Sequence, residues 1–239
     1  MKTIIGDILN LIFPRYCITC GDRLSRSEKM ICVSCLAHLP RTWAHTSSPN
    51  KLEQLFWYHL PIERAAAFFS YDTAETRELI HRMKYHDTPD IGSELGRHFA
   101  KELTNTGFFD GIDLIIPVPL SRKRLSRRGY NQSEYIAKGI SQVTGIRVDT
   151  SVIKRTVDNP SQTQKEFADR LENVRNIFSL CKSEAVKGKH VLIIDDVITS
   201  GATVTSCGKE LVKAGDVRIS VLSLAYADTL LISNNSEQQ

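Results

Sequence analysis

The stretch VLIIDDVITSGAT, residues 191–203, decides the fold. Four aliphatic residues lead directly into Asp195 and Asp196, and a small, hydroxyl-rich turn then precedes a helix-like segment. A short, uninterrupted apolar run is typical of a strand that is buried on both faces of a parallel sheet. We therefore predict a strand over 190–195, a loop after the two acids, and a helix that follows the turn.

The rest of the chain alternates between apolar runs and segments with helical periodicity. Further strands are predicted over 64–71, 113–119, 152–155 and 217–227, and helices over 73–86, 91–103, 131–145 and 202–215, with a helical or partly ordered stretch over 164–176. Such alternation favours parallel strands joined by right-handed crossovers. The expected fold class is an open, mainly parallel α/β sheet with helices on both faces.

The two adjacent carboxylates need a partner, because like charges side by side repel. Capping of the next helix would explain only one of them, whereas the vicinal hydroxyls of a sugar would satisfy both, with help from a divalent cation. The turn after them offers backbone N–H groups, three hydroxyls and little bulk at a helix N-terminus, which suits a phosphate. Its residues are Thr199, Ser200, Gly201, Ala202 and Thr203. Together, these features describe a site for a ribose 5-phosphate.

Four of the six cysteines form a C-x2-C-x11-C-x2-C pattern: Cys17, Cys20, Cys32 and Cys35. Two such pairs can place four thiolates around one ion, so the spacing predicts a structural zinc site. Disulfides are the poorer explanation in a chain without an export signal. With four sulfur ligands, no position is left open for water, and the zinc is not expected to be catalytic.

The composition and the position of a Pro- and Ser-rich stretch indicate the overall organisation of the chain. The chain of 239 residues has 41% hydrophobic and 24% charged residues and a net charge of +4, an ordinary globular balance that does not by itself indicate nucleic acid. A Pro- and Ser-rich stretch places a boundary near residue 50. We expect an amphipathic helix and zinc ribbon with a linker over 1–50, a larger domain over 51–228, and a disordered tail over 229–239. No apolar stretch is long enough to span a membrane, and a cytoplasmic location is expected.

The sequence also resembles a known family. Aliphatic residues, two acids and then T-x-G-x-T closely resemble the motif with which type I phosphoribosyltransferases bind phosphoribosyl pyrophosphate (PRPP). The segments RGYNQ, KRTVDNPSQTQ and ADRLENVRNIF and the four-cysteine N-terminus are similar to the competence protein F (ComF, ComFC or GntX-like) family over nearly the whole chain. The resemblance implies a type I phosphoribosyltransferase fold plus a zinc ribbon, and a role in handling incoming single-stranded DNA during natural transformation.

By this resemblance, Asp195 and Asp196 are the catalytic pair and contact the ribose hydroxyls, while the turn at 199–203 wraps the 5-phosphate. The region 116–134 is similar to the pyrophosphate-binding region of such enzymes, with Val118, Pro119, Arg128 and Gly129 as candidates. Mg²⁺ is expected with PRPP. The resemblance also implies PRPP, single-stranded DNA and a competence-associated helicase as partners.

Further basic residues have two possible roles. Arg122, Lys123, Arg124 and Arg127 are either anion ligands or a solvated basic surface. Arg155 and Arg170 are candidates for a flap that closes over PRPP, with a plain surface loop as the alternative. Arg77, Arg82 and Lys84 could line the pocket, but we expect them to face solvent. The acceptor that would attack PRPP cannot be deduced from the sequence.

The sequence leaves two functions open. The first is a PRPP-dependent enzyme that transfers a phosphoribosyl group. The second is a non-enzymatic DNA-binding adaptor with a regulatory or vestigial PRPP site, and a sensor of PRPP or nucleotides is a weaker third. The intact acidic pair and turn favour the first, while the basic residues and the ribbon favour the second.

Overall fold

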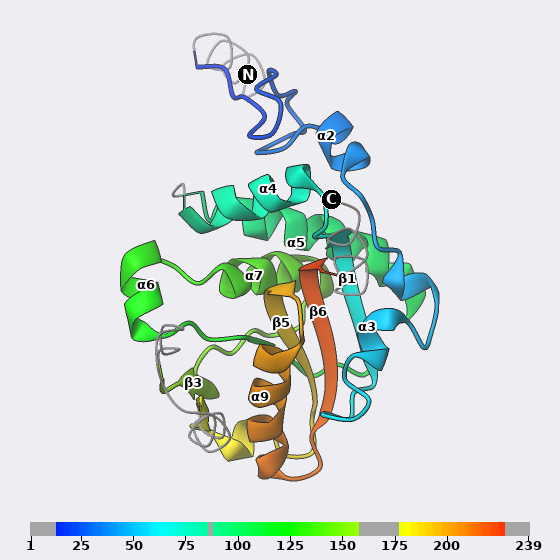
Figure 1. The fold of residues 1–239 in the computed structure, drawn as a ribbon, viewed down its shortest axis with the longest axis vertical. Helices are drawn as coiled ribbons and strands as arrows, with labels where there is room; N and C mark the ends of the chain where they lie inside the picture. The colour runs from blue at the N-terminus through cyan, green and yellow to red at the C-terminus, as the bar shows by residue number, and fades with distance from the viewer. Residues whose placement is uncertain (1–12, 86–87, 158–176, 228–239) are drawn as a thin grey trace, which may run out of the picture.

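A four-stranded parallel sheet forms the centre of the computed structural model, which describes residues 13–85, 88–157 and 177–227 (Figure 1). The strand order is β1-β6-β5-β2, and every neighbouring pair is parallel. The strands are β1 (Arg64–Ser70), β2 (Leu114–Pro117), β5 (His190–Ile198) and β6 (Arg218–Tyr226). This arrangement confirms the predicted parallel α/β sheet.

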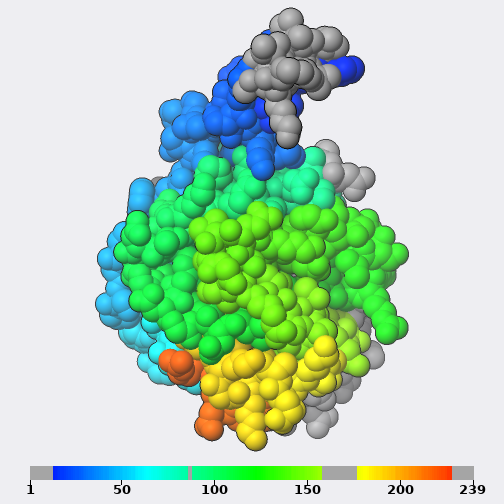
Figure 2. All heavy atoms as spheres, turned by 180° about the vertical axis from the view of Figure 1, so that it is seen from behind, coloured from blue at the N-terminus to red at the C-terminus, as the bar shows by residue number. Residues whose placement is uncertain are grey.

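Two hydrophobic clusters cover the two faces of the sheet. Leu192 and Ile194 of β5 belong to a cluster with α4 (Ala74–Tyr85), α5 (Asp90–Leu103) and α7 (Gln132–Thr144). Val191 and Ile193 belong to a second cluster with α3 (Lys51–Gln54) and α9 (Ala202–Leu211). Figure 2 shows the residues of α5 and α7 (green) on the surface of the molecule on this side. Because successive side chains of a strand point to opposite faces, a continuous apolar run is needed here.

Helices α5 and α7 touch along their backbones. A Cβ atom on Gly139 would lie 2.1 Å from the carbonyl oxygen of Ser93, and one on Gly96 would lie 2.4 Å from that of Ile136. Glycine is therefore required at both positions, since any side chain would force the helices apart. This close approach fixes the N-terminus of α7 beside the carboxyl end of the sheet.

Three local predictions need correction. The basic segment expected to be a loop is instead the helix α6 (Arg122–Arg128), which the Ser121 side chain caps and Gly129 ends. The strand β3 (Ile153–Arg155) does not join the parallel sheet but pairs antiparallel with β4 (Phe178–Leu180), a strand that was not predicted. The strand β5 runs to Ile198, so the acidic pair lies inside the strand and not after it.

The N-terminal region packs onto the helices of the larger domain. Leu24, Ile31 and Leu36 of the cysteine segment, the last in α2 (Val33–His38), share one hydrophobic cluster with Ile80 of α4 and Leu95 of α5. Figure 2 shows this segment (blue) above the green helices. The following stretch runs along β1, where Pro40 accepts a backbone hydrogen bond from Ser70 and Thr42 donates one to Phe68.

Short 3₁₀ helices lie at Ala44–Thr46, Thr104–Thr106, Ser183–Ala185 and Val212–Ala214.

Several predictions fall outside the described residues: the N-terminal amphipathic helix, the helical stretch over 164–176, and the tail over 229–239. Among the residues that the structure does describe, none forms a helix with the length and apolar character that crossing a bilayer requires.

Candidate functional site

The acidic pair lies where β5 keeps only one of its two neighbouring strands. Pairing with β2 ends at Ile194, whereas pairing with β6 continues through Asp195 to Ile198. The Oδ1 atom of Asp195 accepts hydrogen bonds from the backbone N–H of Asp196 (2.9 Å) and from the hydroxyl of Ser133 (3.3 Å), at the N-terminus of α7. From Asp195 onward, β5 therefore pairs with β6 alone.

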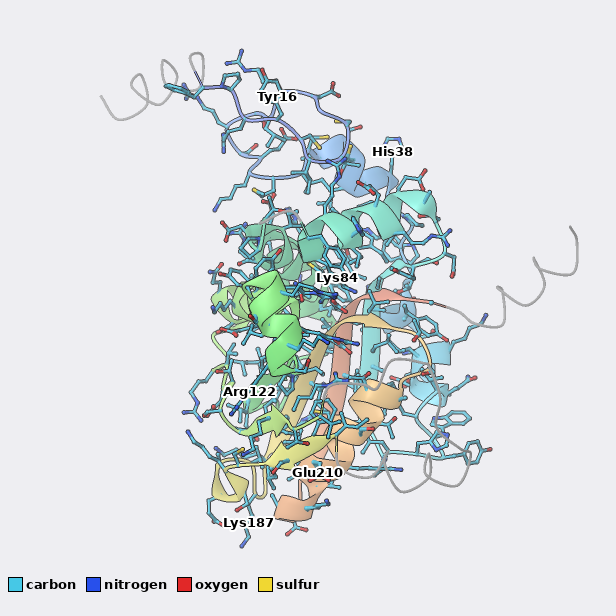
Figure 3. All side chains as sticks on the ribbon, turned by 60° about the vertical axis from the view of Figure 1, so that its left-hand side comes forward. Tyr16, His38, Lys84, Arg122, Lys187 and Glu210 are labelled. Atoms are coloured by element: carbon cyan, nitrogen blue, oxygen red, sulfur yellow. The ribbon has the colours of Figure 1, made fainter. Side chains whose placement is uncertain are left out.

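A lysine from a distant helix pairs with the second acid. The Nζ atom of Lys84, in the last turn of α4, lies 3.0 Å from Oδ2 of Asp196, and the side chains are 19% and 14% exposed. Figure 3 shows Lys84 over the carboxyl ends of β5 and β6. The expectation that Lys84 faces solvent is therefore wrong. Arg82 does not point freely into solvent either, because it donates to the carbonyl oxygen of Ile18 at 2.6 Å.

The turn after β5 combines exposure with a left-handed glycine. Thr199, Ser200 and Ala202 are exposed, and Gly201 (φ 70°) is the residue before α9. No side chain caps this helix, so its first backbone N–H groups have no side-chain acceptor. A Cβ on Gly201 would lie 3.0 Å from both Leu55 and Phe56. Any other residue would therefore be crowded by these side chains and strained by the left-handed backbone conformation.

The loop after β2 lies against the same end of β5. The N–H of Val118 donates to the carbonyl of Ile194 (2.8 Å), and its own carbonyl accepts from the side chain of Asn131 (3.0 Å). Pro119 follows on the partly exposed surface, and Gly129 ends α6 with φ 77°. Of the residues predicted for the pyrophosphate loop, Val118 therefore contacts the residue directly before the acidic pair.

Arg128 connects this loop to α4. Its guanidinium donates to the hydroxyl of Tyr85 (3.3 Å) and to Oε1 of Gln132 (2.9 Å). Two further donor atoms, Nε of Arg128 and Nε2 of Gln132, are buried and find no hydrogen-bond acceptor among the described residues. Buried donors are normally satisfied, so these two atoms fit a site that receives an anion.

Of the two flap candidates, the structure describes only Arg155. It ends β3, which pairs with β4, and its guanidinium lies 5.4 Å from the centre of the Phe178 ring and donates to the carbonyl of Val157. Arg170 lies outside the described residues.

The four predicted cysteines converge near the N-terminus. Their sulfur atoms all lie within 4.8 Å of one another, and Sγ of Cys20 is 3.8 Å from Sγ of Cys32. Zn–S bonds of 2.3 Å in a tetrahedron place sulfur atoms about 3.8 Å apart. Backbone N–H groups also point at the sulfurs, as from Cys32 to Cys17 and from Cys35 to Cys32, both at 3.3 Å. The donor set fits a structural zinc ion.

The charges of the sulfurs support the same conclusion. Burial opposes ionisation of Cys17, yet hydrogen bonds from the backbone of Cys20, Cys32 and Thr19 outweigh it and lower the pKa of its thiol to about 6. Burial and the neighbouring sulfur of Cys32 raise the pKa of Cys35. Thiolates this close together cannot all be ionised unless a cation lies among them.

The ionisation of Asp195 is also perturbed. Burial and the neighbouring charge of Asp196 raise the pKa of its carboxyl to about 7, although Lys84 and the hydroxyl of Ser133 act in the opposite direction. The folded protein therefore favours the neutral form of Asp195. The contribution of this group to the stability of the fold is fully present below the unfolded pKa near 4 and is lost as the pH rises through 7.

We therefore expect Asp195→Asn to stabilise the ligand-free protein at pH 8 and not at pH 3, below the unfolded pKa. Asparagine keeps the Oδ1 acceptor for Ser133 and Asp196 but carries no charge. A rise of the pKa from near 4 to about 7 would correspond to about 4 kcal/mol. Partial exposure and Lys84 reduce this to about 1–3 kcal/mol, or a rise in Tm of roughly 2–10 °C. Thermal unfolding at the two pH values measures the difference. An equal change in Tm at both would contradict the assignment.

The fold and the site together define the class. A parallel sheet with an acidic pair at the end of an inner strand, followed by an open glycine turn and a helix, is the arrangement of a phosphoribosyltransferase-type α/β protein. The family model "Phosphoribosyl transferase domain" matches residues 84–230. The chain belongs to this family and, within it, groups with the DNA utilization protein YhgH and competence protein F.

Three relatives support that grouping. The DNA utilization protein YhgH of Escherichia coli is 30% identical over 87% of this chain and 88% of its own length. Competence protein F of Haemophilus influenzae is 30% identical over 90% of this chain and 86% of its own length. Competence protein ComFC of Bacillus subtilis is 25% identical over 58% of this chain and 54% of its own length. The family resemblance deduced from the motifs is confirmed.

Ser133 and Tyr85 at the site were not predicted, and Lys84 was considered but expected to face solvent. Ser133 follows directly after the RGYNQ segment, so the motif could have pointed to it. Lys84 and Tyr85 have no comparable signal, because they end an ordinary amphipathic helix. Their position at the acids and at Arg128 depends on the tertiary structure.

Proposed function

We propose that this protein binds PRPP together with Mg²⁺ at the carboxyl end of β5, as a phosphoribosyltransferase-like member of the competence family that handles incoming single-stranded DNA. The observation that carries the proposal is the pairing of two adjacent carboxylates with an open helix start a few residues later. Asp195 and Asp196 would accept hydrogen bonds from the ribose hydroxyls. The N–H groups and hydroxyls of 199–203 would hold the 5-phosphate.

The opposite end of the ligand would lie over the loop after β2. Val118 and Pro119 place this loop beside the acids, and Gly129 keeps the end of α6 free of side-chain bulk. The unsatisfied Nε atom of Arg128 is a donor available for a pyrophosphate oxygen. Bound Mg²⁺ would neutralise charge on the pyrophosphate as it leaves.

The residues of this chain would act mainly by positioning and electrostatics. The anomeric carbon gains positive charge as the pyrophosphate departs, so no protein nucleophile is required. The hydroxyls held by the acidic pair and the phosphate held by the turn would fix the ribose from two sides. Arg155 and Arg170 stay predictions for a flap that excludes water.

A calorimetric titration of the protein with PRPP and Mg²⁺ tests the binding directly. We expect saturable binding that requires both, followed by release of pyrophosphate when a suitable acceptor is added. Binding without release, for every nucleobase and for single-stranded DNA, would favour the non-enzymatic adaptor. Absence of binding would contradict both forms of the proposal.

For the organisation of the chain, we propose a zinc-bound ribbon over 1–50 and a phosphoribosyltransferase-like domain over 51–228. The cysteine geometry supports the first, with zinc in a structural role. A competence-associated helicase stays a predicted partner.

Direct binding of single-stranded DNA is supported by the surface of α6. Arg122, Lys123 and Arg127 are exposed on this helix, and so is Leu125, which is 42% exposed. Figure 3 shows α6, with Arg122, beside the carboxyl end of the sheet. A cluster of basic side chains along one helix fits a phosphate backbone and carries little base preference.

We expect the wild type to bind single-stranded DNA weakly, with an affinity that falls steeply as salt increases. Each phosphate contact contributes roughly −0.7 to the slope of log K against log salt. Changing Arg122, Lys123 and Arg124 to Gln should weaken binding and make this slope shallower by about 2. Fluorescence anisotropy with labelled oligonucleotides at several salt concentrations measures both.

The matched control removes the same charge at the opposite end of β5 from the acidic pair. Lys182, Lys187 and Lys189 precede β5, and Figure 3 shows Lys187 below α6. Their replacement with Gln should leave the affinity and the slope close to wild type. If the two triple variants behave alike, α6 is only a solvated basic surface.

A further inference from the structure

The ion pair between Lys84 and Asp196 differs from two other lysine pairs, those of Lys138 and Lys213. Lys84 is 19% exposed, whereas Lys138 and Lys213, which pair with glutamates on their own helices, are 49% and 58% exposed. Removing a lysine from water is costly, and a buried ion pair contributes little net stability. The pair therefore needs another explanation than the stability of the fold.

The acidic pair supplies the first part of that explanation. Asp195 and Asp196 are adjacent and partly buried, and their mutual repulsion would be severe in the ligand-free protein. Lys84 lies close enough to Asp196 to neutralise one charge. It thus occupies an oxygen atom that, under the proposed function, a ribose hydroxyl would use.

The backbone around Lys84 is held in place from both sides. The carbonyl of Met83 accepts a hydrogen bond from the hydroxyl of Tyr130, Arg82 is bound to the carbonyl of Ile18, and Tyr85 is bound to Arg128. Only the flexible methylene chain of Lys84 is free to change direction. Its ammonium group can therefore move by a few ångströms while α4 stays where it is.

A ligand at Asp196 would displace this ammonium group. The hydroxyls of a ribose are neutral, so they cannot replace the charge that Lys84 loses, and a lysine left unpaired in a partly buried site is unfavourable. The 5-phosphate would be held by the turn at 199–203. The anionic group nearest to Lys84 would be the pyrophosphate, because Tyr85, the next residue, holds Arg128 of the predicted pyrophosphate loop.

We infer that Lys84 is a binding residue that exchanges partners: it pairs with Asp196 in the ligand-free protein and with the pyrophosphate group of PRPP in the complex. This inference rests on the proposed function and adds a residue and a ligand group to that site. It assigns to α4 a direct part in distinguishing PRPP from ligands that lack pyrophosphate.

The test compares two ligands on the full-length protein. Titration calorimetry gives the Kd of PRPP and of ribose 5-phosphate, each with Mg²⁺, for the wild type and for Lys84→Gln. Loss of one charge-assisted hydrogen bond should weaken PRPP binding on the order of 10- to 100-fold. Ribose 5-phosphate has no pyrophosphate, so its affinity should stay within about threefold or increase, because Asp196 is released.

Two further variants separate this role from a structural one. Lys84→Arg should recover part of the affinity for PRPP, since it keeps the charge. Lys138→Gln removes a lysine whose ion pair also measures 3.0 Å but lies on the surface of α7, and it should bind both ligands like wild type. Equal losses for the two ligands in Lys84→Gln, or unchanged PRPP affinity, would overturn the inference while leaving the proposed function in place. A wild type that binds no PRPP would overturn both.

Discussion

Changing both Asp195 and Asp196 to Asn should reduce the affinity for PRPP by about two orders of magnitude or more. Each carboxylate is expected to accept a charge-assisted hydrogen bond from a ribose hydroxyl, worth about 1.5–3 kcal/mol. Two such losses amount to about 3–6 kcal/mol, and each 1.4 kcal/mol is a factor of ten. Asparagine keeps the size and one acceptor oxygen of each side chain, so the effect reports charge. Calorimetric titration with PRPP and Mg²⁺ measures it.

The double variant has to remain folded for this result to count. After Asp195→Asn, the amide oxygen of the new side chain can still accept from the backbone N–H of residue 196 and from the hydroxyl of Ser133, as Oδ1 of Asp195 does. We therefore expect an unchanged circular dichroism spectrum and unchanged zinc content. If this variant binds PRPP as tightly as the wild type, the phosphoribosyl interpretation of the protein is wrong.

Replacing Cys32 with Ser should release the zinc and unfold the ribbon. Structural zinc binding in small zinc-finger peptides contributes about 10–16 kcal/mol, and three sulfurs cannot complete a tetrahedral site. Cys32 also precedes α2, where its sulfur accepts from the N–H of Cys35. Serine is a favourable residue at that helix position, so the loss of metal, and not of the cap, causes the effect. Elemental analysis gives the zinc content, and hydrogen exchange over 14–39 gives the unfolding.

An isolated thiol elsewhere in the chain supplies the control. Cys181 is exposed and lies far along the chain, directly after β4. Cys181→Ser should keep one zinc ion per chain and wild-type exchange. The affinity of Cys32→Ser for PRPP should fall far less than that of the double Asn variant, because the acids and the 199–203 turn belong to other elements and only the contact of Arg82 with Ile18 is lost near the site. Wild-type protein purified without chelator that contains no zinc would contradict this prediction.

The central fold could be predicted because β5 and β2 are apolar on both faces. Residues 191–194 and 114–116 are fully buried, as their continuous hydrophobic sequence indicates. The helix α6 was missed because Leu125 is its only apolar residue, so no periodicity reveals it. The strand β4 was missed because it has only three residues, too few to show alternation.

The candidate site also has a part that the sequence predicts and a part that it does not. The acids and the turn are contiguous in the chain, so their common location follows from local sequence. The contacts of Lys84 with Asp196 and of Arg128 with Tyr85 join elements from different parts of the chain. Sequence patterns of one helix reveal which side is apolar, but not which distant carboxylate or arginine its last turn will meet.

The way the ribbon is attached has a consequence for the order of events during synthesis. Its backbone N–H at Met30 donates to the buried carboxylate of Glu94 (3.0 Å), a residue 64 positions later, and its apolar side chains pack against α4 and α5. At translation rates of 5–20 residues per second, Glu94 is added about 3–13 s after Met30. For most of that interval the four cysteines are already synthesised, while the surface that will cover Leu24 and Ile31 does not yet exist. The nascent chain would therefore bind the metal before the ribbon is buried. Helix α5 would then pack against a ribbon that the zinc ion had already folded.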